Sequence, residues 1–439
     1  MTPLASSLLD AAAGAPVLVG FSGGLDSTVL LHLLATDPLR HATGLRAVHV
    51  HHGLQTGADE WAAHCQRTCD AWRLPLQVVR VQVQAEAADG PEAAARRARH
   101  AAFADLLRPG EWLALAHHRD DQAETFLLHA LRGAGVEGLA AMRGRRRFGP
   151  GQLWRPLLQV PRAALEAHAR QHRLHWIEDP SNGDDAFDRN FLRNTLMPLL
   201  AERWPEAGAR FARSATLAAE AAALLLPQDE QRLRACLDDD GTLSIPALAA
   251  LPAGAGARVL RLWSHRCGLP PLPGNGVERI RDELLAAAPD RLPEFRWQTA
   301  RIIRWRDRLH AVDGLRPWPP GWQARWEGRT PLVLPDGGRL ELHGAAGFQR
   351  PVCVRQRRGG ERIQLPGRSH SHLLKHRLQA SATPPWLRPH LPLLCEGDQV
   401  LAAGDRIVSS PLHDWLHAHG AQLCWHPPGN SRPGRPDAN

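Results

Sequence analysis

Short apolar runs of strand length alternate four times with helical patterns in the first 130 residues, and this alternation limits the possible folds more than any other feature. The strand-like runs are Val17–Phe21, Ala47–Val50, Leu76–Val81 and Trp112–Ala116. The helical patterns cover Ser27–Ala35, Ala58–Ala71, Pro91–Leu107 and Asp120–Leu131. Strands joined through such helices form right-handed crossovers, so the sequence predicts a doubly wound α/β domain whose parallel sheet is covered on both faces.

Polar side chains gather where these predicted strands end. Ser22 follows the first strand, His49 and His51 lie around the end of the second, and His117 follows the fourth. In parallel sheets ligands bind outside the carboxyl ends of the strands. We therefore expect the chemistry of this domain at one edge of the sheet.

The sharpest motif is the loop Ser22-Gly23-Gly24-Leu25-Asp26-Ser27 between the first strand and its helix. Two glycines allow positive φ and let backbone N–H groups surround an anion, to which the helix N-terminus adds its positive end. The Gly-Lys-Ser/Thr ending of a Walker loop is absent. Asp26 beside phosphates makes sense if it holds a magnesium ion that bridges them; the alternative is a glycine-rich turn with Asp26 as a helix cap.

A second group of candidates begins at His117. In a helix that starts nearby, His117, Asp121 and Glu124 would share one face. Capping of that helix is the alternative role for Asp120 and Asp121.

Arginines form a third group, but the composition weakens the case for any single one. The chain has 53 basic residues against 45 acidic ones, a net charge of +8, which favours a polyanionic partner such as nucleic acid. Only one of the 53 is lysine and tyrosine is absent, a pattern typical of a GC-rich gene. Arg96 lies on the third helix, and Arg189 and Arg193 lie one helical turn apart, where they could neutralise a phosphate.

Composition also excludes several classes. No stretch of about 18 uncharged apolar residues occurs, so no membrane span is expected. The seven cysteines are odd in number and scattered, which suits free thiols in the cytoplasm.

The chain divides by composition into three predicted domains and a tail. A catalytic domain covers 1–205, a helical domain 206–316, and a small α+β domain 328–425, after a linker rich in proline and tryptophan. A hairpin is expected around Pro335–Gly338, and the tail, 426–439, is expected to be disordered.

The glycine loop resembles that of the PP-loop ATPases, which cleave ATP between its α and β phosphates. An ordered set of further motifs is similar to the tRNA(Ile)-lysidine synthase family over nearly the whole chain. These motifs are His49–Leu54, Glu92…Arg99, Ala116–Thr125, Arg132–Gly135, Arg155–Leu158, Asp179–Asn182, Arg189…Arg193, Arg355…Arg362 and Pro385…Leu394.

This resemblance implies a reaction. Members of the family join free L-lysine to carbon 2 of the wobble cytidine in a CAU-anticodon isoleucine tRNA, through an adenylated intermediate, with release of pyrophosphate and AMP. ATP and Mg²⁺ are the implied cofactors. The implied PP-loop fold is adenine nucleotide hydrolase-like. Residues 243–316 would correspond to the family's substrate-binding domain, and residues 353–396 to its C-terminal domain. Whether the chain forms a homodimer stays open.

The resemblance also implies roles for residues, by position. ATP would be bound by Ser22, Gly23, Gly24, Leu25, Asp26 and Ser27. Catalytic roles fall to Asp26, Arg96, His117, Asp121, Glu124 and Arg189, with Asp26 and Asp121 as magnesium ligands. tRNA-binding roles fall to Arg355, Arg358, Arg362 and Lys375.

Two departures and two alternatives qualify this interpretation. His100 and Phe187 stand where the family usually has tyrosine, so hydrogen bonds from those phenols are lost. A PP-loop tRNA thiolase is the nearest alternative, but Cys65 and Cys69 are the only close cysteine pair. A catalytically inactive RNA-binding protein is the other, although Asp26, Asp121 and Glu124 are all retained.

Overall fold

The structure is a computed structural model that describes residues 14–53, 57–81, 91–288, 291–315, 317–368, 370–381 and 383–427, with side chains from 94 onward in the segment that begins at 91. The chain divides into two compact units, Met1–Pro227 and Gln228–Asn439. Within the described ranges no helix is both long and apolar enough to cross a membrane. The predicted tail falls outside the described residues beyond 427.

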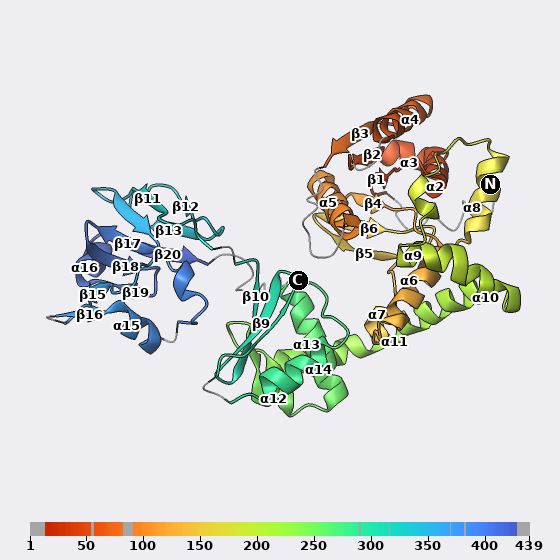
Figure 1. Cartoon of the computed structure of the whole chain (residues 1–439). Helices are drawn as coiled ribbons and strands as arrows, with labels where there is room; N and C mark the ends of the chain where they lie inside the picture. The colour runs from red at the N-terminus through yellow and green to blue at the C-terminus, as the bar shows by residue number, and fades with distance from the viewer. Residues whose placement is uncertain are drawn as a thin grey trace. The chain divides into compact units, whose positions relative to one another are not determined.

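The first unit is built on a six-stranded sheet (Figure 1). Its strand order is β3-β2-β1-β4-β6-β5, and every neighbouring pair is parallel except β5 with β6. Its elements are β1 (Val17–Gly20), α2 (Leu25–Ala35), α3 (Pro38–Thr43), β2 (Leu45–His51), α4 (Ala58–Ala71), β3 (Leu76–Arg80), α5 (Pro91–Leu106), β4 (Trp112–Ala114), α6 (Arg119–Leu131), α7 (Val136–Leu139), β5 (Arg145–Phe148), β6 (Gly151–Trp154), α8 (Arg162–Gln171), η2 (Pro180–Gly183), α9 (Asp188–Phe191), the π-helical turn η3 (Leu192–Leu196), α10 (Met197–Arg203) and α11 (Ala207–Cys236), which continues into the second unit. The predicted parallel α/β sheet is confirmed.

Alternating side chains of β1 explain why the sheet is covered on both faces. Val17 and Val19 pack with residues of α2, α4 and α8 in one core. Leu18 points the other way and packs with Phe103 of α5 in a second core. All three β1 side chains are fully buried. A strand buried on both faces is the pattern of a doubly wound domain.

The sheet brings several loops to one edge. The glycine loop follows β1, His117 follows β4, and Arg155 follows β6. Because β5 runs antiparallel to β6, the residues that precede β5 also lie at this edge. The edge therefore joins four loops, of which the one before β5 was not expected from the sequence.

The second unit begins with a mixed layer of helices and strands. A four-stranded antiparallel sheet has the order β7-β10-β9-β8 and packs against α13 through residues such as Ile302 and Trp263. The sequence predicts a helical domain at 206–316, so the four-stranded sheet is an addition to that prediction. The elements are β7 (Leu243–Ser244), α12 (Ile245–Ala249), α13 (Ala253–Arg266), α14 (Gly276–Arg279), the π-helical turn η4 (Ile280–Leu285), β8 (Glu294–Trp297), β9 (Ala300–Trp305) and β10 (Arg308–Asp313).

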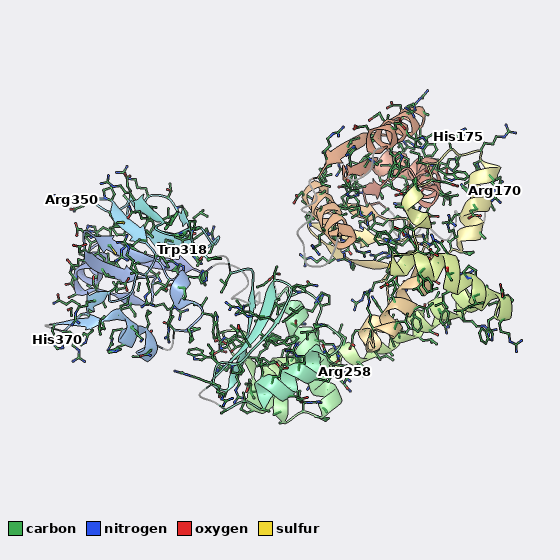
Figure 2. All side chains as sticks on the ribbon, viewed as in Figure 1. Arg170, His175, Arg258, Trp318, Arg350 and His370 are labelled. Atoms are coloured by element: carbon green, nitrogen blue, oxygen red, sulfur yellow. The ribbon has the colours of Figure 1, made fainter. Side chains whose placement is uncertain are left out.

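The remainder of the second unit consists of small antiparallel sheets with short helices. The expected hairpin is present, since Leu332 pairs with Leu340 across the Pro335–Gly338 turn. Trp318, labelled in Figure 2, donates its indole N–H to the buried Asp336, which also contacts His390 Nδ1 at 3.0 Å. The elements are β11 (Gln323–Trp326), β12 (Leu332–Val333), β13 (Arg339–His343), β14 (Val352–Arg355), β15 (Arg362–Gln364), β16 (Ser371–Leu373), α15 (Leu374–Ala380), η5 (Arg388–His390), β17 (Leu393–Glu396), β18 (Gln399–Ala403), β19 (Ile407–Val408), α16 (Ser410–Ala418) and β20 (Gln422–His426).

Candidate active site at the carboxyl edge of the parallel sheet

The glycine loop turns sharply at Gly23, where φ is +85°. A side chain there would meet Cys65 Sγ at 3.0 Å, so the turn has neither the conformation nor the room for one. Ser22 Oγ lies 3.0 Å from Ser27 Oγ and accepts from the Gly24 N–H at 3.3 Å. The loop is thus closed on itself by its two serines, with the N-terminus of α2 directly behind it.

Asp26 lies in the first turn of α2, but it does not cap that helix. The N-cap residue is Gly24, and no side chain bonds to the cap. One Asp26 oxygen, Oδ1, is buried without a hydrogen-bond partner and has Arg162 Nε at 4.0 Å, and Oδ2 lies 3.6 Å from His118 Nε2. Burial, together with the charge of Asp121, raises the pKa of Asp26 despite the opposing charge of His118. An orphaned carboxylate oxygen beside a second carboxylate is suited to a cation.

Asp121 is held by a capping box at the start of α6. The His118 N–H donates to Asp121 Oδ2 at 3.0 Å, and the Asp121 N–H donates back to His118 Nδ1 at 3.4 Å. Burial would raise the pKa of Asp121, but the charges of His118 and Arg189 outweigh it and lower the pKa. The capping role considered for Asp121 is therefore real, and it leaves Oδ1 for other partners. Asp120 instead accepts from the Arg162 N–H at 2.9 Å.

Two arginines bind this acidic pair. Arg189 donates to Asp121 Oδ1 and to Glu124 Oε2, both at 2.9 Å. Arg193 donates to Asp121 Oδ1 at 2.8 Å and to Glu124 Oε1 at 2.7 Å. Glu124 is only 2% exposed, so it requires these partners. The predicted catalytic set contains Arg189 but not Arg193, although the spacing of one turn between them was the available signal.

His117 lies on the connection between β4 and α6, just before the cap. The expectation that it shares a helical face with Asp121 and Glu124 was wrong, because α6 begins at Arg119. Its Nδ1 accepts a hydrogen bond from Arg155 Nε at 3.2 Å. Burial lowers the pKa of His117 to about 3, so the imidazole is neutral at physiological pH. Arg155 was not singled out as a site residue by sequence analysis.

Arg96 lies on α5 and faces the same edge. Its positive charge contributes, after burial, to the lowered pKa of His117 and of Arg155. It also lowers the pKa of His100, which burial brings to about 4. The edge therefore has an acidic side around Asp26 and Asp121 and a basic side around Arg96 and Arg155.

The two histidines at the end of β2 have structural partners. His49 Nδ1 lies 3.0 Å from the Phe21 carbonyl oxygen, and burial lowers its pKa. His51 Nε2 lies 3.2 Å from Asp59 Oδ1. These contacts join β2 to the neighbouring elements.

The four C-terminal candidates differ in what they contact. Arg355 is committed to the buried Glu361 at 3.4 Å, and Arg362 donates to Ser371 Oγ at 2.9 Å. Arg358 is exposed, and only its backbone N–H contacts Glu361. Lys375 is exposed on α15.

Three protein-family models match the chain in order. A PP-loop domain matches residues 4–200, a TilS substrate binding domain 243–310, and a TilS substrate C-terminal domain 352–425. A curated tRNA(Ile)-lysidine synthase from Xanthomonas axonopodis pv. citri is 56% identical over 95% of this chain and 96% of its own length. The chain belongs to the tRNA(Ile)-lysidine synthase family. A more distant member, from Pseudomonas aeruginosa, is 43% identical over 98% of both chains.

Among solved structures, the U34-tRNA thiolase NcsA from Methanococcus maripaludis is 17% identical, with a TM-score of 0.40, over 48% of this chain and 75% of that chain. Likeness at that level carries no argument. Membership of the lysidine synthase family rests on the full-length relatives, and its PP-loop domain contains every site residue described above for the sheet edge.

Proposed function

We propose that this chain ligates free L-lysine to carbon 2 of the wobble cytidine of a CAU-anticodon isoleucine tRNA and consumes ATP. The observation that carries the proposal is the convergence, at one sheet edge, of a phosphate-type glycine loop with two acids and two arginines. Family membership over nearly the whole chain supports it.

In the first step, the oxygen on carbon 2 of the cytidine attacks the α-phosphorus of ATP, and pyrophosphate leaves. Ser22–Ser27 would hold the phosphates through backbone N–H groups and the N-terminus of α2. The basic side of the edge, with Arg96, would stabilise the charge that develops on phosphate oxygens.

Asp26 and Asp121 are the residues that would hold a magnesium ion. The Oδ1 of Asp26 fits such an ion, since it accepts no hydrogen bond and Arg162 Nε comes no nearer than 4.0 Å. When bound, the ion neutralises phosphate charge. The His118 imidazole lies within 3.6 Å of the carboxylates of Asp26 and Asp121, where it counters part of their negative charge.

In the second step, the lysine amine attacks carbon 2, the bond from that carbon to the AMP oxygen breaks, and one proton leaves the nitrogen. A pyrimidine carbonyl oxygen is a poor leaving group, whereas the adenylate departs as AMP. Holding lysine beside the activated carbon makes this step effectively unimolecular. The acidic side of the edge suits the cationic substrate.

Neither of the two alternatives, a PP-loop tRNA thiolase and a catalytically inactive RNA-binding protein, is favoured. Sulfur transfer would require reactive thiols, but burial raises the pKa of Cys65 and of Cys69 to about 12. All seven cysteines are free, and these two are buried in the core under the glycine loop. An inactive scaffold would gain nothing from a buried carboxylate with an unsatisfied oxygen at residue 26.

The test is incorporation of labelled lysine into a CAU-anticodon isoleucine tRNA transcript, with AMP release measured in the same reaction. We expect lysine transfer and AMP release in equal amounts, both dependent on ATP and magnesium. Intact tRNA binding without lysine transfer would overturn the proposal.

Arg358 and Lys375 are the C-terminal side chains that we propose for tRNA contact, because both are exposed. Arg355 would serve mainly to hold the loop that contains Glu361, and Arg362 would serve mainly to hold β15 against β16 through Ser371. Light scattering on the purified protein would decide between a monomer and the homodimer that the sequence left open. A cytoplasmic location would follow from the proposed tRNA substrate.

A further inference from the structure

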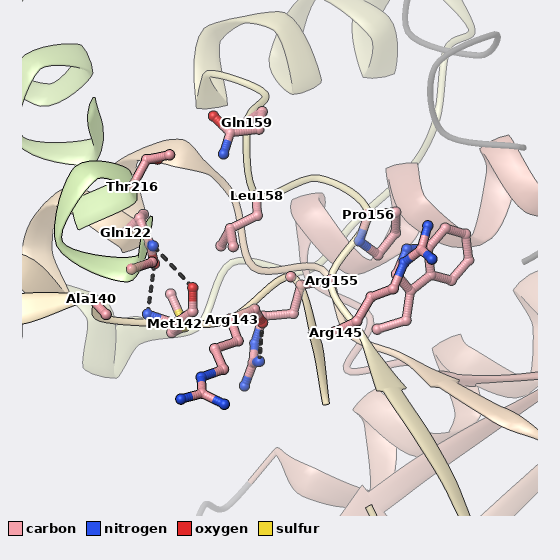
Figure 3. Close-up of a pocket in the computed structure, with 13 residues that line it drawn as sticks. Gln122, Ala140, Met142, Arg143, Arg145, Arg155, Pro156, Leu158, Gln159 and Thr216 are labelled. Carbon is pink, nitrogen blue, oxygen red and sulfur yellow. Dashed lines mark hydrogen bonds between the residues drawn. The ribbon is translucent and has the colours of Figure 1, made fainter. Parts of the chain in front are cut away.

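A cavity of about 410 Å³ lies at the carboxyl edge, between the β5–β6 hairpin and α11 (Figure 3). Three of its lining residues are Arg143, Arg145 and Arg155, and we call this cavity the arginine pocket. Gln122 and Gln159 supply its neutral polar groups, and no acidic side chain is among the described residues that line it. The Arg145 guanidinium lies over the Trp112 ring, 5.2 Å from its centroid, so the positive charges of the cavity come mainly from Arg143 and Arg155, without a compensating carboxylate in its described lining.

Arg155 is the most informative of the three. It is only 6% exposed, yet within the described part of the chain its hydrogen bonds go to neutral acceptors alone. These are His117 Nδ1 at 3.2 Å and the Arg143 carbonyl oxygen at 2.8 Å. Burial, followed by the charges of Arg146 and Arg96, lowers its pKa to about 10. A buried guanidinium without a counter-charge is costly, and a bound anion would relieve that cost.

The position of the pocket relates it to the reaction. In the sheet order, β4 stands between β1, which carries the glycine loop, and β6, which carries Arg155. His117, at the end of β4, contacts Arg155 directly. Strands are spaced by about 4.8 Å, so the ends of β1 and β6 are roughly 10 Å apart, with the end of β4 between them.

The positive charge of the pocket favours one of the three substrates of the proposed reaction, which are lysine, ATP and RNA. Free lysine carries two ammonium groups and one carboxylate at neutral pH, a net charge of +1, so a pocket lined by arginines without an acid attracts its carboxylate but repels both of its ammonium groups. The phosphates of ATP already have the glycine loop. RNA supplies a backbone phosphate on each side of the target nucleotide, and a planar guanidinium fork binds phosphate well.

We propose that the arginine pocket binds a backbone phosphate of the RNA anticodon loop next to the cytidine that is modified. This inference rests on the proposed function for the identity of the nucleotide. It assigns Arg143 and Arg155 as substrate-positioning residues on the side of the reacting centre opposite the ATP loop.

The test compares Arg143→Gln with Arg147→Gln. Arg143 is exposed at the mouth of the pocket, and within the described residues its side chain makes no hydrogen bond or ion pair. Arg147 is exposed on β5, just after Arg143 in the chain, but does not line the cavity, so it controls for the loss of one charge. The measurements are the Kd for a short anticodon stem-loop RNA at several salt concentrations, the KM values for ATP and lysine, and thermal unfolding.

For Arg143→Gln we expect the RNA Kd to rise about three- to tenfold and the salt slope to fall by about one, with little change for Arg147→Gln. The KM values for ATP and lysine should not change. Arg155→Lys, which keeps the charge but loses the fork, should weaken RNA binding in the same direction.

Equal effects of Arg143→Gln and Arg147→Gln would overturn the proposal, because they would show general attraction instead of a pocket. A raised KM for lysine or ATP with unchanged RNA affinity would overturn it in favour of another anion. Because RNA binding is measured without turnover, a native protein that binds the stem-loop but transfers no lysine would contradict the proposed function and leave the pocket testable.

Discussion

The Nε–H of Arg155 donates to Nδ1 of His117 at 3.2 Å, and this bond fixes where the imidazole carries its proton. A guanidinium is always a donor, so Nδ1 must be the acceptor and the proton must sit on Nε2. His117 therefore offers the active edge a neutral N–H donor. It is not a base at physiological pH, because burial lowers its pKa to about 3.

This relationship can be measured by ¹⁵N NMR of the imidazole. The His117 signals should report the neutral Nε2–H form from roughly pH 5 to 8, and the pH–rate profile should show no step from this residue. A His117 signal that titrates near the ordinary value of 6.5 would refute the assignment.

Asp26→Asn should separate activity from stability. Because burial raises the pKa of Asp26, its ionised form is disfavoured in the folded protein, and the stability it contributes is lost as pH rises from 3.8 through the raised pKa. Above that range the variant should unfold at an equal or higher temperature, while adenylation is abolished. The readouts are thermal unfolding and AMP release. A clear fall in the unfolding temperature would mean that Asp26 has a structural role instead.

Glu124→Gln should destabilise the protein by about 2–3 kcal/mol, because Arg189 and Arg193 lose the buried negative charge that both of them bind. The loss is moderate because both arginines are partly exposed and remain partly hydrated. A double-mutant cycle with Arg193→Gln, followed by urea unfolding, should give a coupling energy of at least about 1 kcal/mol. The control is Glu166→Gln, whose pairs with Arg162 and Arg170 lie on the surface of α8 and should contribute less than about 0.5 kcal/mol. Equal effects of the two variants would contradict the buried network.

Gly23→Ala should cost about 1–2 kcal/mol of stability, because φ at this position is +85°. It should also weaken ATP binding, because a Cβ would meet Cys65 Sγ and displace the loop. Gly110→Ala is the matched control, since its φ is +77° and the space around it is open. Both variants should lose stability, and only Gly23→Ala should lose nucleotide affinity.

The histidines His32, His168 and His172 pack together where α2 meets α8, with His32 Nδ1 at 3.1 Å from His168 Nε2. Burial first, then the charges of His168 and His172, lower the pKa of His32 to about 4. The unfolded chain binds this proton near 6.5, so stability is lost as pH falls from about 6.5 towards about 4. The His32→Leu variant should lose less stability than the native protein over this range in urea unfolding. An equal reduction in the exposed His41→Leu variant would argue against the interpretation.

The sequence predicted the parallel sheet and the glycine loop because both are local patterns. The predicted strand Val17–Phe21 and helix Ser27–Ala35 differ from the observed elements by one and two residues at their ends. The hairpin of β5 and β6 was missed, since Arg145-Arg146-Arg147 lacks apolar alternation. Its Gly149-Pro150 turn was the available signal.

Which arginines matter could not be read from the sequence. Arg193 meets Glu124 across 69 residues, and Arg155 meets His117 across 38. In a chain whose basic residues are almost all arginine, nothing local distinguishes Arg155 from a solvated side chain, and the only local signal for Arg193 is its spacing of one turn from Arg189. Only the fold selects them, by burying their partners.

The Lys375 side chain is exposed on α15, so its amine is accessible to chemical modification. It is the only lysine in the chain, so an amine-reactive dye has one side chain to modify besides the N-terminal amine. A fluorophore can therefore be placed on one known side chain in the C-terminal part of the native sequence without engineering a cysteine. Because acylation removes the charge of Lys375, a lower tRNA affinity of the labelled protein would report its proposed contact, independently of events at the ATP loop.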